Sequence, residues 1–398
     1  MAKSNSSPLR VLSLFSGCGG LDLGFSGGFT FLHKRYNRLN TKIVFANDFD
    51  IDAVTCYNNN KLLTKDGVKS VCKDVREITT DEMPNFDIML AGFPCQPFSN
   101  AGNRKGVNDD NGRGTLFEVC ERVIKEKSEN GHKPKAFLFE NVRGILSSKM
   151  PDGKTTVPEE IRKRMELLGY KVSMQLVCSA NYGVPQNRFR VLIIGIDNKL
   201  NKEFLFANLE ETVAKHNIPS KDFGKQEKLL LGNILQNVPK DDVWEYTAAT
   251  QKMIEQIGAC DNDLNFFSKD FSYSEIPNHL KEGRSWKNIP PSQLTPRFKK
   301  IYDNPQKYHS PKFFRRFALG EINGTITASS QPENCGITHP FEHRRFSVRE
   351  IARIQSFPDN FDFSSIPLQS KYKVIGNAVP PVMAWVVAKT LTDLLRET

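Results

Sequence analysis

The chain has 398 residues, of which 39% are hydrophobic, and this is enough apolar material for a large core divided between two domains. Its formal net charge of +10 suits a polyanionic partner such as nucleic acid, although proteins that bind none also reach this value. No apolar run approaches the ~18 residues of a membrane-spanning helix, and the polar N-terminus lacks the apolar stretch of a secretion signal, so we expect no membrane segment. The 8 cysteines include no CxxC pair and no cluster with histidine at zinc spacing, which predicts free thiols in a reducing cytoplasm and no metal site.

The chain opens with a predicted buried strand over residues 10–15, a glycine-rich turn over 16–20 and a helix over 21–25. A strand that enters a helix through such a turn is typical of sites that seat a nucleotide-like ligand. The dinucleotide fingerprint GxGxxG fails, because Asp22 stands where the third glycine should be. Hydride transfer from a nicotinamide cofactor is therefore disfavoured.

Acidic residues follow three further predicted strands, which cover residues 43–46, 70–71 and 136–139. Asp48 follows the first of them, and an acid at this place can hydrogen-bond both hydroxyls of a ribose. It can equally cap the helix predicted over 51–59, so both interpretations stay open. Asp74 follows the second strand. Glu140 follows the third, and its position after four buried-type residues favours a site over a surface carboxylate.

Cys95 follows the apolar strand pattern of residues 87–91 and lies between two prolines, which restrict the backbone on either side. A free cysteine most often packs as a small hydrophobic residue, and that is the alternative here. A thiolate held at a fixed angle after a strand can instead act as a nucleophile. The polar loop 100–114 then leads into a helix predicted over 115–124, and its composition is typical of a lid beside a reactive group.

A helix is predicted over residues 161–168 and strands over 172–177 and 190–196. Between these strands Gln186, Arg188 and Arg190 occupy alternate positions, so in extended chain they share one face, either in a site or along a solvated edge. The alternation of strands and helices over 10–196 predicts an open, mainly parallel α/β sheet of the Rossmann-like class. Ligands of such sheets collect at the carboxyl ends of the strands. One crevice would then contain Phe15, Asp48, Asp74, Cys95 and Glu140.

The strand and helix rhythm stops near residue 197, and polar residues dominate from there to about residue 340, which predicts a second domain. Residues 279–316 hold ten Lys and Arg against two acids, with aromatic residues interleaved. This composition fits a surface that contacts nucleic-acid phosphates, and a solvated loop is the alternative.

The last segment contains two predicted helices separated by a break. Ser347 is positioned to cap the first of them, with Glu350 three residues later as its capping-box partner. The second helix covers residues 382–395 and is apolar enough to dock onto the first domain. That docking would bring Asn377 into the same crevice.

The ordered motifs over residues 10–196 and 340–395 resemble the cytosine-C5 DNA methyltransferase family, which is typical of bacterial restriction-modification systems. The matching elements are Phe15-Ser-Gly-Cys-Gly-Gly20, Asn47-Asp48, Asp74, Gly92-Phe-Pro-Cys-Gln-Pro-Phe-Ser99, Glu140-Asn-Val142, Gln186-x-Arg188-x-Arg190, the 345–355 helix and Gly376-Asn-Ala-Val-Pro380. The family more often has Glu where this chain has Asp48, but the shorter acid can still reach a ribose.

The resemblance implies an S-adenosylmethionine-dependent methyltransferase fold. It divides the chain into a catalytic domain over 1–196, completed by 370–398, and an irregular target-recognition domain over 197–369. Cys95 is implied as the nucleophile that adds to carbon 6 of a flipped-out cytosine. Glu140 is implied to hold N3 and the exocyclic amine, and the side chains of Arg188 and Arg190 to help with the base and the geometry of the site.

The implied cofactor is S-adenosyl-L-methionine, with no metal. Its expected contacts are Phe15, Gly17, Gly19, Gly20, Asp48, Phe49, Asp74, Val75, Pro94, Leu116, Asn377 and Ala378. The expected DNA contacts are Gln96, Ser99, Arg104, Gln186, Arg284, Lys287, Arg297, Lys299, Lys300, Arg315 and Arg316.

The implied partner is double-stranded DNA read through its major groove, and a restriction endonuclease of the same specificity would act beside this enzyme. We expect a monomer in the bacterial cytoplasm, associated with the nucleoid. The alternatives are the same reaction on transfer RNA and a non-catalytic nucleic-acid-binding protein. The basic middle domain favours duplex DNA, and the presence of Cys95 and Glu140 together with both arginines disfavours a loss of catalysis.

Overall fold

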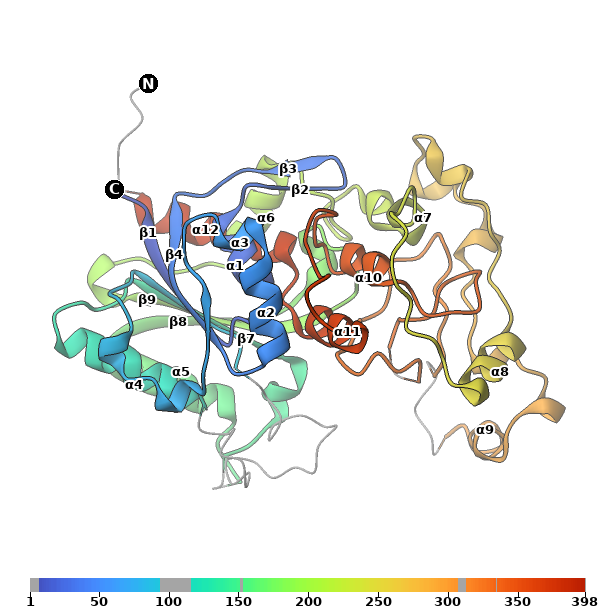
Figure 1. Ribbon diagram of the computed structural model, residues 1–398, viewed down its shortest axis with the longest axis horizontal. Helices are drawn as coiled ribbons and strands as arrows, with labels where there is room; N and C mark the ends of the chain where they lie inside the picture. Colours follow the sequence, from blue (N-terminus) through green and yellow to red (C-terminus); the bar gives the residue numbers. More distant parts are fainter. Residues whose placement is uncertain (1–6, 94–115, 151–152, 307–312, 334, 398) are drawn as a thin grey trace.

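The computed structural model describes residues 7–93, 116–150, 153–306, 313–333 and 335–397. Its central feature is a seven-stranded sheet with the strand order β5-β4-β1-β6-β7-β9-β8 (Figure 1). The strands are β1 (Leu9–Leu14), β4 (Thr41–Asp48), β5 (Ser70–Cys72), β6 (Ile88–Ala91), β7 (Ala136–Val142), β8 (Tyr170–Cys178) and β9 (Phe189–Asp197). The first five strands in this order run parallel, whereas β9 is antiparallel to both β7 and β8. The predicted α/β class with a mainly parallel sheet is confirmed.

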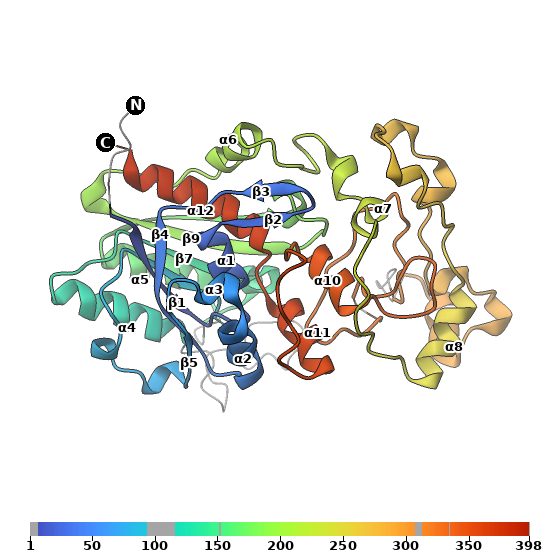
Figure 2. The same cartoon turned by 45° about the horizontal axis from the view of Figure 1, so that its top comes forward.

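Helices cover both faces of the sheet (Figure 2). One face is covered by α1 (Gly20–Ser26), α2 (Ile51–Asn59), α3 (Lys61–Thr64), α6 (Ala207–Lys215) and α12 (Pro381–Arg396), and the other by α4 (Leu116–Glu129) and α5 (Val157–Leu167). Neighbouring side chains of a strand point to opposite faces. In β6, Ile88 and Leu90 therefore pack with the α1 and α12 side, whereas Met89 and Ala91 pack with α4 and α5. Burial on both faces explains why these strands read as continuous apolar runs.

The C-terminal helix α12 packs into the first domain after α11 (Leu368–Asn377) and a short break. The indole Nε1 of Trp385 donates to the carbonyl of Asn37 at 2.8 Å, and its ring contacts Tyr36 edge-on at 5.4 Å. The stretch Leu368–Arg396 has the length and composition of a membrane span, but 89% of its most apolar window is buried in the protein. The predicted docking of the final helix onto the first domain is confirmed.

A small hairpin was not expected from the sequence. It consists of β2 (Phe29–Phe31) and β3 (Lys34–Tyr36), and the rings of Phe29 and Tyr36 stack across it at 5.1 Å. Its turn uses Leu32 and His33 with φ of +42° and +65°. Hairpin turns with positive φ values usually contain Asn-Gly or another glycine, which makes them recognisable in the sequence. This turn contains neither.

The second half of the chain forms an irregular unit beside the sheet, shown at the right of Figure 1. Its helices are α7 (Leu231–Ile234), α8 (Ala248–Ile257), α9 (Pro296–Tyr302) and α10 (Val348–Ile354). A separate small core joins α8 to Trp286, Phe298 and Phe314. The domain boundary near residue 197 stays a prediction. The packing favours a boundary after α6, because the hydroxyls of Thr212 in α6 and Thr390 in α12 bond at 2.7 Å.

Candidate active site and cofactor site

The turn after β1 is held open by unusual backbone conformations. Phe15, a non-glycine residue, has φ of +56°, and Gly17 and Gly19 have φ of +54° and +87°. A left-handed aromatic residue stores strain, which is a frequent mark of functional sites. The amide of Ser16 donates to the carbonyl of Asn47 at 2.9 Å, so the turn is tied to the end of β4.

Asp48 lies at the end of β4 and faces this turn. Its Oδ2 accepts from the amide of Gly17 at 2.8 Å, and its Oδ1 accepts from the amide of Asp50 at 2.9 Å. Burial raises the pKa of Asp48, while these amides oppose the shift. The helix-capping alternative is wrong, because Asp50 rather than Asp48 caps α2 through the amide of Asp52. The next residue, Phe49, is 72% exposed, so a carboxylate and an open aromatic face lie side by side.

Asp74 is at the end of β5 but is already engaged. It caps a short 3-10 helix and forms a 2.5 Å ion pair with Arg76, and the hydrogen bond from Arg76 lowers the pKa of Asp74. The side chains of Val75 and Leu116 are buried in the apolar core under α4. A cofactor could therefore meet Val75 only through its backbone, and the expected contacts of these three residues stay predictions.

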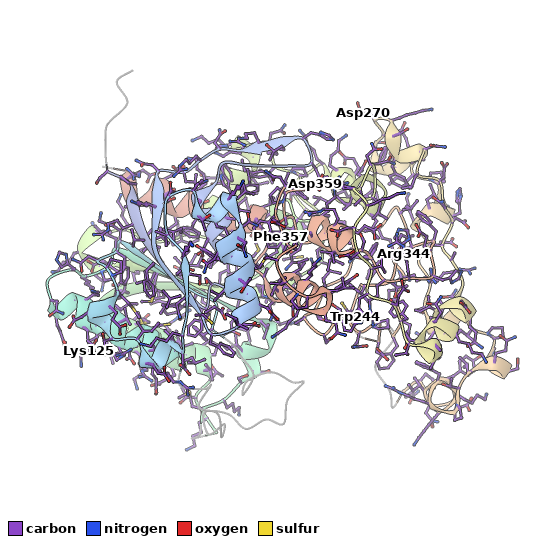
Figure 3. All side chains as sticks on the ribbon, in the orientation of Figure 1. Lys125, Trp244, Asp270, Arg344, Phe357 and Asp359 are labelled. Carbon is purple, nitrogen blue, oxygen red and sulfur yellow. The ribbon has the colours of Figure 1, made fainter. Side chains whose placement is uncertain are left out.

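The C-terminal segment reaches the same turn. Asn377 ends α11, and a Cβ placed on Gly20 would lie 2.3 Å from the carbonyl oxygen of Val379 and 3.3 Å from the Cβ of Ala378. Only glycine permits this approach. Phe357, labelled in Figure 3, lies 3.2 Å from the same position. The residues directly after Asn377 thus approach the glycine turn, whereas the place of Asn377 in the crevice and its contact with a cofactor stay predictions.

Glu140 and Arg190 form a nearly buried ion pair. Glu140 lies near the end of β7, and its Oε1 is 2.7 Å from Nε of Arg190 in the antiparallel neighbour β9. Both side chains are about one-tenth exposed, at 10% and 12%. Burial lowers the pKa of Arg190, and the negative charge of Glu140 opposes that shift. The ion pair thus fixes the direction of the carboxylate, and Oε2 lies on the side of Gly92.

The start of the Cys95 loop lies beside this carboxylate. A Cβ on Gly92 would lie 3.7 Å from Oε2 of Glu140, and Nδ2 of Asn141 donates to the carbonyl of Phe93 at 3.2 Å. Cys95 is two residues further along the chain. Pro94, Cys95, Gln96, Ser99, Arg104 and the predicted lid over 100–114 lie outside the described residues.

A family model of C-5 cytosine-specific DNA methylases matches residues 9–393. The chain belongs to this family. One relative is the Type II methyltransferase M.FnuDI of Fusobacterium nucleatum, 31% identical over 395 residues, with 98% of this chain and 96% of the relative covered. Another is M.NgoFVII of Neisseria gonorrhoeae, 30% identical over 400 residues, with 99% and 89% covered.

Two solved structures share the fold. S. pombe Dnmt2 methyltransferase superposes with a TM-score of 0.57 at 18% identity, covering 97% of this chain and 99% of that one. Entamoeba histolytica methyltransferase EhMeth gives 0.58 at 15% identity, covering 98% and 100%. The family assignment makes the protein a DNA (cytosine-5)-methyltransferase that uses S-adenosyl-L-methionine, and the transfer-RNA alternative is not favoured.

Two residues that we expected in the site of this methyltransferase instead form hydrogen bonds inside the protein. Gln186 is fully buried, and its Nε2 donates to Oε1 of Gln355 at 2.5 Å, so the expectation that it contacts DNA is corrected. Arg188 is 1% exposed, and its guanidinium donates to the carbonyls of Ile326 and Gly376 at 2.8 and 3.0 Å. The expectation from their alternate positions was that these side chains share one face of the chain. At Gln186 and Arg188 that face points into the protein.

Arg316 is a third correction. It is fully buried, and its guanidinium donates to the carbonyls of His339, Glu342 and Ile254, each at 3.0 Å. A guanidinium that is fully buried among backbone oxygens cannot reach a phosphate outside the protein. We expected Arg316 on the basic surface because the sequence alone does not distinguish a buried arginine from an exposed one.

The other basic residues of the stretch remain accessible. Arg284, Lys287, Arg297, Lys299 and Lys300 are exposed, and Arg315 is partly exposed. A pocket of about 540 Å³ lies between the β8–β9 connection and the second half of the methyltransferase. Its lining includes Asn187, Lys221, Lys287, Arg315 and Glu321, and the only acid of the full lining, Glu321, is paired with Arg315 at 2.6 Å. The pocket is therefore positively charged.

Proposed function

We propose that Cys95, Glu140 and Arg190 perform the methyl transfer to carbon 5 of a cytosine flipped out of duplex DNA. The observation that carries this proposal is the Glu140–Arg190 ion pair at 2.7 Å beside the start of the Cys95 loop. It fixes the direction of a carboxylate beside the residues that lead into the Cys95 loop. Ring carbons are inaccessible within a duplex, so the base must leave the helix to meet both groups.

The proposed chemistry starts with the Cys95 thiolate, which forms a bond to carbon 6 and pushes an electron pair onto carbon 5. Glu140 hydrogen-bonds N3 and the exocyclic amine and favours protonation at N3 as charge builds on the ring. Arg190 keeps the carboxylate in the required direction. S-adenosyl-L-methionine would supply the electrophilic methyl group that carbon 5 takes, and the neutral thioether S-adenosyl-L-homocysteine would be the leaving group. Loss of the proton from carbon 5 and departure of the Cys95 thiolate restore the aromatic ring.

The residues around the first turn fit this cofactor. A Cβ on Gly17 would meet no atom of the described residues within 4 Å, and the carboxylate of Asp48 accepts from the amide of this glycine. Asp48 would hold the ribose, and the half-buried ring of Phe15 and the exposed ring of Phe49 would cover the apolar parts. Asn377 and Ala378 would close the other side.

The proposed DNA contacts are the accessible basic residues of the second half, namely Arg284, Lys287, Arg297, Lys299, Lys300 and Arg315. Asn187, which lines the positively charged pocket, lies three residues before Arg190. At most about 10 Å of chain therefore separates this edge of the pocket from Arg190. Phosphates flanking the flipped base would therefore pass these side chains.

The Type II names of the relatives support a role in a restriction-modification system. We further propose that a restriction endonuclease of the same specificity acts on the same sites, and that methylation protects the host DNA. The enzyme would act as a monomer on the nucleoid in the bacterial cytoplasm.

The residue roles are tested by incubating the enzyme and its Glu140→Gln variant with labelled S-adenosyl-L-methionine, on genomic DNA and on total transfer RNA. The wild type should place 5-methylcytosine in DNA, and Glu140→Gln should lower the single-turnover rate on the order of 100-fold. Lys125→Ala, which breaks an exposed ion pair with Glu129 at 4.0 Å, is the matched control and should act like the wild type. Label in RNA alone, or an unimpaired Glu140→Gln enzyme, would contradict the proposal.

A further inference from the structure

Gln355 ends α10 and has no role in the reaction described so far. It is fully buried, and its side chain uses both ends of the amide. Its Oε1 accepts from Nε2 of Gln186 at 2.5 Å, and its Nε2 donates to the carbonyl of Ala378 at 2.6 Å. Gln186 in turn accepts from the amide of Ile326 at 3.0 Å. An amide can donate and accept at once, so this chain of bonds runs unbroken from the second half to the C-terminal segment.

The end of this chain of bonds is next to the glycine turn. Ala378 follows the last residue of α11, where backbone carbonyls lose their helical partners. Its neighbour Val379 presents a carbonyl oxygen 2.3 Å from where a Cβ of Gly20 would be. The position of this segment therefore sets the width of the space over the turn.

A second set of hydrogen bonds, made by Arg188, links the same two parts of the chain. Arg188 donates to the carbonyls of Ile326 and Gly376 at 2.8 and 3.0 Å. A Cβ on Gly376 would lie 2.4 Å from the carbonyl carbon of Thr327, so the two segments are in direct backbone contact. Gln355 binds a residue beside the turn, because the Cβ of Ala378 lies 3.3 Å from where a Cβ of Gly20 would be.

We propose that Gln355 is a positioning residue of the cofactor site, which holds Asn377 to Val379 against the turn at Gly17 to Gly20 through its bond to Ala378. The inference rests on the proposed cofactor site. Gln355 does not touch the cofactor. Its loss leaves the carbonyl of Ala378 without this buried donor and leaves Nε2 of Gln186 with the carbonyl of Ile354 at 3.3 Å, and the segment relaxes away from the turn.

The test compares Gln355→Met, which keeps the size and removes both bonds, with Gln355→Asn, which keeps the amide but is too short to reach both partners. Ser347→Ala is the matched control, because it removes the cap at the other end of α10, where the hydroxyl accepts from the amide of Glu350 at 3.3 Å. Cofactor affinity is measured by calorimetry without DNA, and kcat and KM for the cofactor are measured on duplex DNA.

Both Gln355 variants should raise the cofactor Kd and KM about tenfold, with kcat at saturating cofactor within about twofold of the wild type. Ser347→Ala should lower the melting temperature without changing Kd. The inference fails if the Gln355 variants fold, as judged by circular dichroism, and bind the cofactor like the wild type, or if Ser347→Ala weakens binding as much. Failure of the wild type itself to bind S-adenosyl-L-methionine would instead overturn the proposed cofactor site.

Discussion

At the scale of residues, Asn141 connects the strand that carries the acid to the loop that carries the nucleophile. It is 3% exposed, its Nδ2 donates to the carbonyl of Phe93, and its Oδ1 accepts from the amide of Val142 at 2.9 Å. Phe93 is also fixed by edge contacts with the rings of Phe139 and Phe15 at 5.7 and 6.4 Å. The backbone that enters the Cys95 loop is thus anchored by one hydrogen bond and two aromatic contacts.

Asn141→Asp is expected to slow attack by Cys95 about tenfold, because the carboxylate cannot donate to Phe93 yet still accepts from Val142. The rate of covalent complex formation on a duplex with 5-fluorocytosine measures this step. Cofactor affinity should stay unchanged, and an equal loss of cofactor binding would show a general disturbance instead.

Asp22 predicts a pH dependence of stability. It is fully buried, where it accepts hydrogen bonds from the hydroxyls of Ser13 at 2.6 Å and Tyr57 at 2.8 Å. Burial raises its pKa from 3.8 to about 6, and the two hydroxyls oppose the shift. The folded state therefore binds the proton more tightly than the unfolded state, so stability rises as pH falls through about 6.

From pH 7 to pH 5 this group should add on the order of 1 kcal/mol to the free energy of unfolding. Urea unfolding at both pH values, in the wild type and in Asp22→Asn, isolates the contribution, because the amide does not titrate. The difference between the two proteins should change by this amount, and a difference independent of pH would contradict a raised pKa.

At the scale of elements, the sequence predicted structure well where the interacting residues are close together in the chain. The capping box of Ser347 and Glu350 is present at the start of α10, as expected. The hairpin turn at Leu32 and His33 was missed, because its left-handed residues are held by the stacked rings on either strand rather than by glycine. The ion pair of Arg190 with Glu140 also depends on the antiparallel pairing of β7 and β9, which a rule of parallel strands does not predict.

Burial of an arginine explains the wrong expectation in the second half, which placed Arg316 on the DNA-binding surface. Arg316, Arg345 and Arg353 each donate to backbone carbonyls of distant segments, which replaces the strand ladders that this region lacks among its described residues. Arg345 also lies between the rings of Trp244 and Tyr246, at 4.4 and 4.3 Å. Sequence composition predicts only that such residues are charged, so it assigned Arg316 to the DNA surface.

Arg316→Met should therefore destabilise the fold by about 3 kcal/mol, because two segments, at Ile254 and at residues 339–342, lose a shared charged donor. Chemical denaturation measures this loss. Lys287→Ala is the matched comparison from the same stretch, and its exposed side chain should make it nearly neutral. Equal stability of both variants would contradict the structural role of Arg316.

At the scale of the whole molecule, the positively charged pocket joins the β8–β9 connection at Asn187 to the irregular second half at Lys287. Lys287→Ala should weaken DNA binding for all sequences alike and reduce the slope of log Kd against log salt by about 1. Lys228→Ala is the control, since Lys228 is paired with Asp270, labelled in Figure 3, at 3.0 Å. An unchanged slope for Lys287→Ala would remove it from the DNA surface.

The assignment of Cys95 as the nucleophile is tested most directly by trapping. The enzyme is incubated with S-adenosyl-L-methionine and duplex DNA that contains 5-fluorocytosine, because the fluorine blocks loss of a proton from carbon 5. Mass spectrometry of the digested complex should locate the modified base on Cys95. Cys95→Ala should form no complex, whereas Cys72→Ala, which removes an exposed thiol at the end of β5, should form it like the wild type. A complex formed by Cys95→Ala, or a base attached to another residue, would contradict the account.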